Sequence, residues 1–324
     1  MLILQKMSKN MSLQKLESSM KPEVSILMNC FNSETYLNEA IESVFQQTFT
    51  DWELIFVDNC SSDSSAQIAS SFGEKVKVVR TEKNIPLGAA RNFGISHCSG
   101  DYIAILDTDD IWFPSTLEKQ LSEIKSGDYA LVYGGQENIN TSGITIGEMR
   151  PKQKSGFIFG SLLKQFDVPI VTTMLSKKHL SNSGLKFDPN VTASEEYCLF
   201  MQLAAKYKFS VIDDVLVKYR IHDNSLTNKS ISRWGDERRY TLNKIISENS
   251  AIREEYSSEF DEAFSRAAYY DAQYFMSIQD KKSAERVLRP CAFKGYKYFL
   301  LFILLKFFPG VWNKMQRMKY GRNI

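Results

Sequence analysis

Short apolar runs alternate with segments of helical periodicity along the first 134 residues of the chain. The runs predict strands at residues 24–28, 52–57, 76–79, 102–106 and 129–133. Between them, apolar side chains recur at the spacing of one helix face, as in residues 37–45. The run at 102–106 shows no polar alternation, which suits a strand buried on both faces of a parallel sheet. The pattern predicts an α/β fold with a doubly wound, mostly parallel central sheet flanked by helices.

This alternation fades after residue 135. Glycines near 134–135 and 143–147 indicate hairpins and loops, and further strands are predicted at 171–175 and 215–220. A helix is predicted to begin at Ser194, and residues 230–290 carry apolar stripes that predict a packed helical region. We therefore expect a main domain over 21–228, with halves of about 21–134 and 135–228, and a helical C-terminal region over 229–324. Residues 1–20 lack a continuous apolar core, so we expect a dispensable, disordered polar leader and no signal peptide.

The last apolar run, residues 296–312, is shorter than the roughly 20 residues that a bilayer-spanning helix needs. Lys294, Lys297 and Lys306 flank it, which favours a helix lying on an anionic lipid surface. A terminal helix docked on the core, or a partner interface, is the alternative.

Composition and charge add two constraints. The 324 residues are 43% hydrophobic and 24% charged, as expected of a globular protein. From Lys281 onward there are 11 basic residues and one acidic residue, Glu285, whereas the first 280 residues hold 29 basic and 37 acidic ones. An acidic body with a basic tail indicates that the tail meets an anionic surface. The five scattered cysteines form no Cys-x-x-Cys pair, which disfavours zinc sites and disulfides and fits a reducing cytosol.

Polar residues follow several predicted strands at their carboxyl ends, where open α/β sheets bind ligands: Asn29, Asp58-Asn59 and Asp107-Thr108-Asp109-Asp110. Carboxylates crowded this closely favour a hard cation such as Mg²⁺ or Mn²⁺. The alternative is an acidic turn, with Asp110 as a helix N-cap.

The chain has no Gly-x-Gly-x-x-Gly after the first strand and no Gly-Lys-Ser/Thr, which disfavours dinucleotide dehydrogenases and P-loop enzymes. A nucleotide would then be held by a metal and basic side chains. Arg91, at the start of a helix, is the candidate, although it could equally be a surface charge. Glu195 and Glu196 suit the positive end of a helix dipole, and His222 follows Arg220 at a strand end, where a structural role is the alternative.

Five motifs in order resemble the inverting family 2 glycosyltransferases, of the bacterial surface-polysaccharide type. They are residues 24–32, 46–48 with 53–59, 90–95, 100–110, and 195–196 with Tyr219-Arg220-Ile221-His222. The resemblance covers about residues 24–227 and implies a GT-A fold. Residues 230–324 resemble only the variable tails of bacterial polysaccharide enzymes.

Carried over position by position, the resemblance implies a set of roles. Asn29, Phe31 and Asn59 would border the base and ribose, with Asp58 beside them. Asp107 would approach the ribose, and Asp109 would bind the metal on the diphosphate. Arg91 and His222 would contact the nucleotide or its metal, Glu196 would be the catalytic base, and Glu195 and Arg220 would support the site. Asn59 and Glu196 stand where the family more often has Asp. The change at Asn59 affects which nucleobase the donor carries, and the change at Glu196 affects the reach of the catalytic carboxylate to the acceptor.

The sequence thus predicts a metal-dependent hexosyltransferase of polysaccharide or lipopolysaccharide synthesis, with Mn²⁺ or Mg²⁺ as cofactor. The expected donor is a nucleotide sugar, with UDP as the expected nucleotide, and the expected acceptor is a glycan or lipid-linked hydroxyl. We expect a cytoplasmic protein, peripheral on the inner face of the plasma membrane, with no nucleic-acid partner. A nucleotidyltransferase and a non-catalytic sugar-nucleotide-binding scaffold are the alternatives. A glycoside hydrolase is rejected, because it would leave the metal-type cluster without a purpose.

Overall fold

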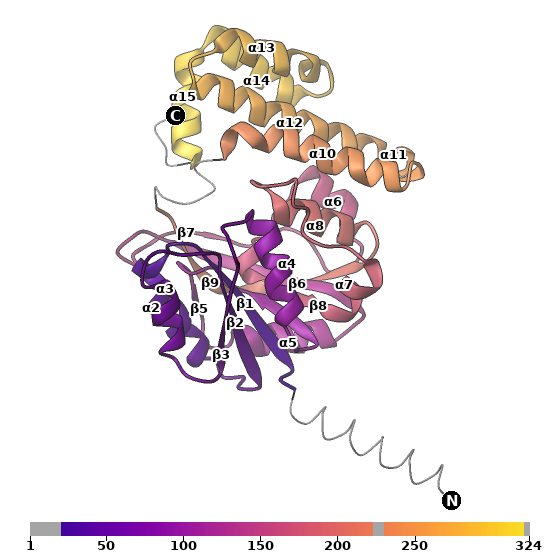
Figure 1. Ribbon diagram of the computed structural model, residues 1–324. Helices are drawn as coiled ribbons and strands as arrows, with labels where there is room; N and C mark the ends of the chain where they lie inside the picture. The colour runs from indigo at the N-terminus through magenta and orange to yellow at the C-terminus, as the bar shows by residue number, and fades with distance from the viewer. Residues whose placement is uncertain (1–20, 223–229, 321–324) are drawn as a thin grey trace, which may run out of the picture. The chain divides into compact units, whose positions relative to one another are not determined.

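A computed structural model describes residues 21–222 and 230–320 (Figure 1). The predicted leader, residues 1–20, lies outside the described residues. Two compact units are present, and they interleave along the sequence. Unit 1 comprises residues up to 151 together with 168–184 and 209–220, and unit 2 comprises 152–167, 185–208 and the chain from residue 221. Each unit is described by itself below.

Unit 1 contains one mixed sheet, in which the described strands follow the order β3-β2-β1-β4-β8-β6-β9-β5, with β7 paired to β6. The first four neighbours are parallel: β3 (Val76–Arg80), β2 (Trp52–Asp58), β1 (Val24–Cys30) and β4 (Tyr102–Ile105). Every residue of β2 is buried, as the continuous apolar run predicts for a strand covered on both faces.

Helices cover these strands as the periodicity predicts. They are α2 (Glu34–Phe45), α3 (Ser65–Ser70), α4 (Leu87–His97) and α5 (Thr116–Lys125). Leu37, Ala40, Ile41 and Val44 form the buried face of α2, so the predicted stripe is confirmed. α4 packs on β1 and β2, and α5 packs on β6 and β8.

The remaining strands run partly against this direction. β8 (Met174–Ser176) is antiparallel to both β4 and β6 (Tyr129–Ile139), while β7 (Thr145–Met149) forms a hairpin with β6. β9 (Lys208–Arg220) is longer than the predicted strand and pairs with the short β5 (Ile111–Trp112), which the pattern did not predict. The prediction of a strand over 171–175 is wrong for its first part, where Ile170–Thr172 forms a 3₁₀ turn.

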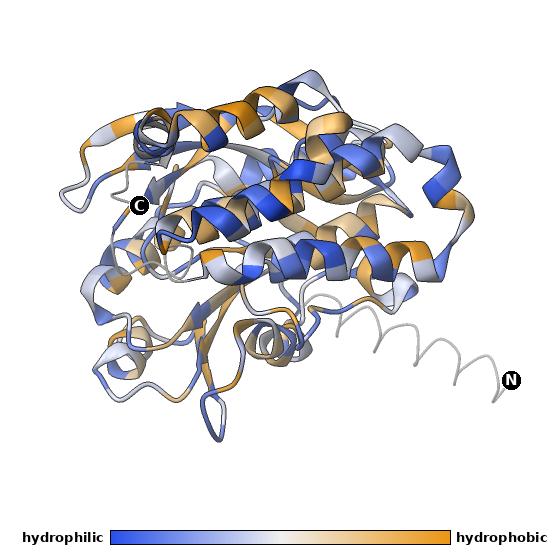
Figure 2. Cartoon of the chain, turned by 90° about the horizontal axis from the view of Figure 1, so that it is seen from above, coloured by the Kyte–Doolittle hydropathy of each residue, from blue (hydrophilic) through white to orange (hydrophobic). Residues whose placement is uncertain are grey.

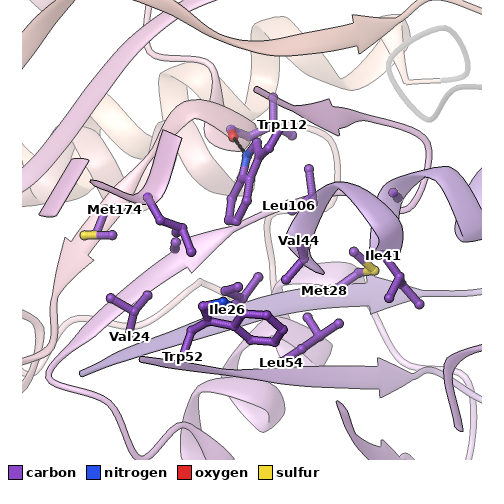
Figure 3. Close-up of a cluster of buried hydrophobic side chains, with 14 of the residues drawn as sticks. Val24, Ile26, Met28, Ile41, Val44, Trp52, Leu54, Leu106, Trp112 and Met174 are labelled. Atoms are coloured by element: carbon purple, nitrogen blue, oxygen red, sulfur yellow. Dashed lines mark hydrogen bonds between the residues drawn. The ribbon is translucent and has the colours of Figure 1, made fainter. Parts of the chain in front are cut away.

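The core of unit 1 lies between the sheet and α2 (Figure 3). Trp52 and Trp112 are its largest members, with 5% and 3% of their surfaces exposed. The indole N–H of Trp112 donates to the carbonyl of Val171 at 2.9 Å, which satisfies its polar group inside an apolar cluster.

Unit 2 is helical in its described parts: α6 (Phe159–Lys164), α8 (Glu195–Ala204), α10 (Ile231–Glu248), α11 (Ala251–Glu255), α12 (Ser257–Ser277), α13 (Lys281–Leu288), η2 (Arg289–Phe293), α14 (Tyr296–Phe307) and α15 (Pro309–Tyr320). Figure 2 shows hydrophobic and hydrophilic positions sharing the same helices, as amphipathic periodicity predicts. The run at 296–312 forms two helices rather than one, because Pro309 lacks the N–H that a continuing helix needs.

One face of the last helices packs inside unit 2, as expected from the alternative prediction of a terminal helix docked on the core. Tyr298, Leu305 and Trp312 are buried in a cluster with residues of α12 and α13. Among the described helices, the longest apolar stretch falls short of what crossing a bilayer requires.

Candidate active site

The parallel register brings the predicted polar strand ends to one edge of the sheet. Cys30, the last residue of β1, pairs with Asp58, the last residue of β2, and Leu27 pairs with Ile105, the last residue of β4. Asn29, Asp58-Asn59 and Asp107–Asp110 therefore all emerge at the carboxyl edge, as expected for a ligand-binding α/β sheet.

Asn29 offers hydrogen-bonding groups at this edge. Both its amide nitrogen and its amide oxygen are buried, and neither has a hydrogen-bond partner among the described residues. A buried amide left unpaired costs about 1–3 kcal/mol, so such groups are normally satisfied. Phe31, two residues further, exposes 49% of its surface. An amide and an exposed ring together suit a planar, polar ligand such as a nucleobase.

Asp58 and Asn59 are engaged with the protein itself. The carboxylate of Asp58 accepts hydrogen bonds from the Ser61 N–H at 2.8 Å and from the Arg80 guanidinium. The Asn59 oxygen accepts from the Thr81 hydroxyl and from the Ile85 N–H, both at 3.0 Å, and its NH₂ donates to the Ile85 carbonyl at 2.8 Å. Because both acceptor positions of Asn59 are used, its visible role is to fix the loop 81–85.

Arg91 lies inside the fold, with 2% of its surface exposed, so it is not a surface charge. Its guanidinium lies 3.5 Å from the Asp107 carboxylate, which is about one-third exposed. A buried arginine beside a partly exposed carboxylate holds that carboxylate in place and keeps positive charge at the edge.

Asp110 is the most enclosed acid of the loop, with no exposed surface. One carboxylate oxygen accepts from the Arg220 backbone N–H at 2.8 Å, and the other has no partner among the described residues. Burial, together with the negative charges of Asp109 and Asp107, raises the pKa of the Asp110 carboxyl well above its usual range.

Arg220, predicted as a supporting residue, joins this loop to α2 and to the turn at 140–141. Its Nε donates to the Asp109 carbonyl at 3.0 Å, and Nη2 donates to the Glu39 carboxylate of α2 at 2.6 Å. Nη1 lies 3.4 Å from the carbonyls of the turn at 140–141, and the guanidinium stacks 4.2 Å from the Tyr36 ring. With 2% of its surface exposed, Arg220 is a buried residue that fixes the backbone of the acidic loop.

The acidic loop fits a cation whose coordination is shared with a ligand. The described residues hold no cluster of three or more His, Cys, Asp or Glu side chains placed to bind a metal by themselves. Asp107 and Asp109 are half-buried and follow the strand end, and their negative charges add to the effect of burial in raising the pKa of Asp110. One or two carboxylates completed by phosphate oxygens are the usual protein site for Mg²⁺ or Mn²⁺. The residues present therefore fit such an ion.

Glu195 and Glu196 occupy the first turn of α8 in unit 2, where Glu195 is buried and Glu196 is half-buried. Nearby Arg238 stacks over the rings of Tyr197 at 4.0 Å and Tyr270 at 5.0 Å. Burial lowers the pKa of Arg238, but Tyr270, Tyr197 and Glu196 outweigh it, so the pKa rises and the side chain stays charged. Glu196 thus lies in the field of a fixed positive charge.

The segment leading into α8 is held by a single carboxylate from α10. Glu237 accepts hydrogen bonds from the N–H groups of Thr192 and Ala193, both at 2.9 Å, and from the hydroxyls of Thr192 at 3.2 Å and Ser194 at 3.0 Å. Ser194, predicted as the N-cap, makes no side-chain cap bond and donates to Glu237 instead. This clamp fixes the backbone that carries Glu195 and Glu196.

His222 belongs to unit 2 and is half-buried, two residues after Arg220 in the chain. The structure thus brings Asn29, Asp58, Asn59, Arg91, Asp107, Asp109 and Arg220 to one edge of unit 1. Glu195, Glu196 and His222 are placed within unit 2.

Three contributors were missed by the sequence-based prediction: Asp110 as a buried acid, Glu39 as the partner of Arg220, and Glu237 as the clamp. For Asp110 the signal was the third carboxylate after the strand. Glu39 and Glu237 are single acids within predicted helices, and nothing local in the sequence distinguishes them from solvated charges.

Comparison with known proteins gives consistent matches. A family model described as "Glycosyl transferase family 2" matches residues 25–177. An uncharacterized glycosyltransferase of Methanocaldococcus jannaschii is 33% identical over 219 residues, covering 64% of this chain and 74% of that protein. The UDP-Glc:alpha-D-GlcNAc-diphosphoundecaprenol beta-1,3-glucosyltransferase WfgD of Escherichia coli is 30% identical over 219 residues, covering 66% and 84%.

Solved structures match the fold. TarS residues 1–349 of S. aureus, in complex with UDP-GlcNAc, superimposes with a TM-score of 0.67 at 18% identity, covering 87% of this chain and 86% of that one. The mannosyltransferase PcManGT from Pyrobaculum calidifontis, in complex with GDP-Man and Mn²⁺, gives a TM-score of 0.59 at 14% identity, covering 91% and 84%. The GT-A-like α/β fold with a helical C-terminal region is confirmed.

Proposed function

The chain belongs to glycosyltransferase family 2, and we propose that it is an inverting, metal-dependent hexosyltransferase that uses a UDP-sugar. The observation that carries the proposal is the acidic loop 107–110 at the carboxyl edge of the sheet, held by Arg220 and Arg91. Beside it, the unpaired amide of Asn29 supplies groups that a base or ribose would satisfy.

The reaction is a single displacement at the anomeric carbon of the donor sugar. Glu196 accepts the proton of an acceptor hydroxyl as its oxygen forms the new bond to that carbon. The bond between the anomeric carbon and the diphosphate oxygen breaks, and the nucleoside diphosphate leaves with the electron pair. Attack from the face opposite the leaving group inverts the configuration.

The residues of unit 1 bind and orient the donor. Asn29 and Phe31 border the base, with Asp58 and Asn59 shaping the neighbouring loop. Asp107 approaches the ribose.

The acidic loop and its neighbours bind the diphosphate and its metal in this proposal. Asp109 would hold Mn²⁺ or Mg²⁺, which supplies positive charge to the departing diphosphate when bound. Arg91 and His222 would contact the nucleotide or its metal, and Arg220 and Glu195 would support the loops that carry the reacting groups.

The acceptor we propose is a lipid-linked glycan hydroxyl, in the synthesis of a surface polysaccharide or lipopolysaccharide. This rests on the family members named for such reactions, among them WfgD of E. coli and a putative teichuronic acid biosynthesis glycosyltransferase of Bacillus subtilis. Such an acceptor places the enzyme in the cytoplasm, peripheral on the inner face of the plasma membrane.

The test compares ligand binding with turnover. We expect UDP with Mn²⁺ to raise the melting temperature of the wild type, since a ligand that binds only the folded state stabilises it. Asp109→Ala should abolish this rise, while Asp101→Ala, an exposed acid at the opposite end of β4, should keep it. Glu196→Gln should keep the rise but lose donor consumption in the presence of acceptor.

Each other outcome counts against a defined part of the proposal. A metal-dependent rise in melting temperature with GDP instead of UDP refutes the proposal that the donor is a UDP-sugar. Normal turnover by Glu196→Gln refutes the assignment of the base. Binding without donor consumption by the wild type, over a panel of lipid-linked acceptors, favours a non-catalytic scaffold, and release of diphosphate from a nucleoside triphosphate favours a nucleotidyltransferase.

A further inference from the structure

An apolar stripe runs along the exposed side of α14. At about 100° per residue, five side chains of this helix fall within about 100° of arc: Tyr296, Phe299, Leu300, Ile303 and Phe307. Four of them are exposed, at 77%, 47%, 46% and 60% for Tyr296, Phe299, Leu300 and Phe307 respectively. The opposite side of the same helix carries Tyr298 and Leu305, which are buried in the core of unit 2. Packing within the unit therefore accounts for one apolar face of α14 and not for the other.

Lysines border the stripe on both sides. On the same helical wheel, Lys297 lies about 100° to one side of Tyr296, and Lys306 about 80° to the other. The Lys297 ammonium reaches Glu262 at 2.8 Å, and Lys306 lies over the rings of Phe302 and Phe307 at 5.8 and 5.2 Å. Long side chains that cover apolar surface with their stems and keep the charge at its border are typical of membrane-interface helices.

The apolar and basic character continues on both sides of α14. Phe293 before the helix is 84% exposed, and Phe308 and Val311 after it are 57% and 54% exposed. Arg289 and Lys314 are exposed as well, and the sequence from 286 to 324 contains no Asp or Glu. Single exposed apolar residues need no explanation, but this many exposed apolar residues along one short part of the chain indicate an interaction surface.

We propose that this surface, defined as the exposed faces of η2, α14 and the start of α15, lies on an anionic phospholipid membrane. The 12 residues of α14 span about 18 Å, less than the roughly 30 Å of a bilayer core, so the helix lies along the interface. Aromatic and aliphatic side chains of the stripe enter the headgroup region, and the bordering lysines face the lipid phosphates. This proposal does not depend on the reaction proposed above.

Charge distinguishes this partner from a second copy of the chain. In a two-fold symmetric dimer a patch meets itself, so Lys297 and Lys306 would face the same lysines of the other copy. Glu262 already pairs with Lys297, and no acidic residue follows Glu285 in the sequence to neutralise Lys306. Anionic lipid supplies both the apolar environment and the opposite charge.

The experiment is co-sedimentation of the full chain with vesicles of phosphatidylcholine, alone or with about one third phosphatidylglycerol. We expect the wild type to bind the anionic vesicles and to bind the neutral ones at least ten-fold more weakly. Leu300→Asp should weaken anionic binding at least ten-fold, since it places a charge in the stripe. Lys306→Gln should weaken it about five-fold, as expected for one lysine near an anionic surface.

Ile278→Asp is the matched control, because Ile278 exposes 53% of its surface in the same unit but lies outside the stripe. It should bind as the wild type does. Thermal melts of all variants check folding, which exposed positions should not disturb. The proposal is overturned if the wild type does not bind anionic vesicles, or if Leu300→Asp binds them equally well. Light scattering measures the mass of each protein in solution. If Leu300→Asp changes that mass but not vesicle binding, the surface serves self-association instead.

Discussion

Replacing Glu53 by Gln should destabilise unit 1 by an amount that depends on pH. Glu53 lies near the amino end of β2 with 4% of its surface exposed, and it accepts hydrogen bonds from Ser25 at 2.7 Å and from the Ser99 N–H and hydroxyl at 2.7 and 2.6 Å. Lys77 of β3 completes the network at 2.6 Å. Burial would raise the pKa of Glu53, but these four donors outweigh it and lower the pKa from 4.5 to about 2.

The magnitude follows from this difference in pKa. A difference of about 2.5 units, at about 1.36 kcal/mol each, corresponds to about 3.4 kcal/mol, and we expect about 2–3 kcal/mol because Lys77 is half-exposed and screened. The folded-state pKa is lowered, so this stability is present above pH 4.5 and is lost as the pH falls towards 2. At pH 3.5, by the same linkage, about 60% of it should remain.

Urea denaturation followed by tryptophan fluorescence measures the free energy of unfolding of both proteins between pH 7 and pH 3.5. The gap between wild type and Glu53→Gln should be constant down to about pH 5 and then shrink. Asp101→Asn is the control, because the Lys21–Asp101 ion pair is exposed and should contribute less than about 1 kcal/mol. A gap below about 1 kcal/mol at pH 7, or a gap that does not shrink on acidification, would refute the reasoning.

Two further predictions concern the buried charges that hold the candidate site. Arg220→Lys should lower the free energy of unfolding by about 2 kcal/mol and weaken Mn²⁺-dependent UDP binding at least ten-fold, because an ammonium cannot bond the Asp109 carbonyl and Glu39 in the same fork geometry. Urea denaturation measures the first effect and titration with UDP measures the second. A variant that binds UDP with wild-type affinity would contradict this prediction. Glu237→Gln should lower kcat about ten-fold with UDP affinity unchanged, because it weakens the clamp on the segment before Glu196. Steady-state kinetics separate the effect on kcat from the effect on KM, with Glu248→Gln, a change of an exposed acid on the same helix, as the control. A loss confined to KM would count against a positioning role.

The sequence predicted the parallel half of the sheet well because each of its strands is an uninterrupted apolar run. It predicted the antiparallel half less well, since residues 171–175 are buried throughout whether they form strand or turn. Hydrogen bonds from the Thr172 N–H to the Pro169 carbonyl and from the Thr173 N–H to the Ile170 carbonyl close a 3₁₀ turn there. Periodicity reports burial, and burial alone does not determine strand direction or length.

The candidate site shows a similar division. Positions on the carboxyl edge could be predicted, because strand ends and acidic residues are local features. Their present partners could not: Asn59 bonds backbone groups of the loop 81–85, and Arg220 bonds a carbonyl 111 residues earlier in the chain. Such contacts depend on the tertiary fold, which no short motif records.

Both loops that carry the proposed reacting groups are fixed by the same physical arrangement. A buried charged side chain from a distant element bonds the loop backbone: Arg220 donates to the Asp109 carbonyl, and Glu237 accepts from the N–H groups of residues 192 and 193. Charge-assisted bonds to backbone are stronger than neutral ones and do not consume the side chains that they position. Errors in the placement of Asp109 should therefore appear in donor affinity, and errors in the placement of Glu196 should appear in the rate constant.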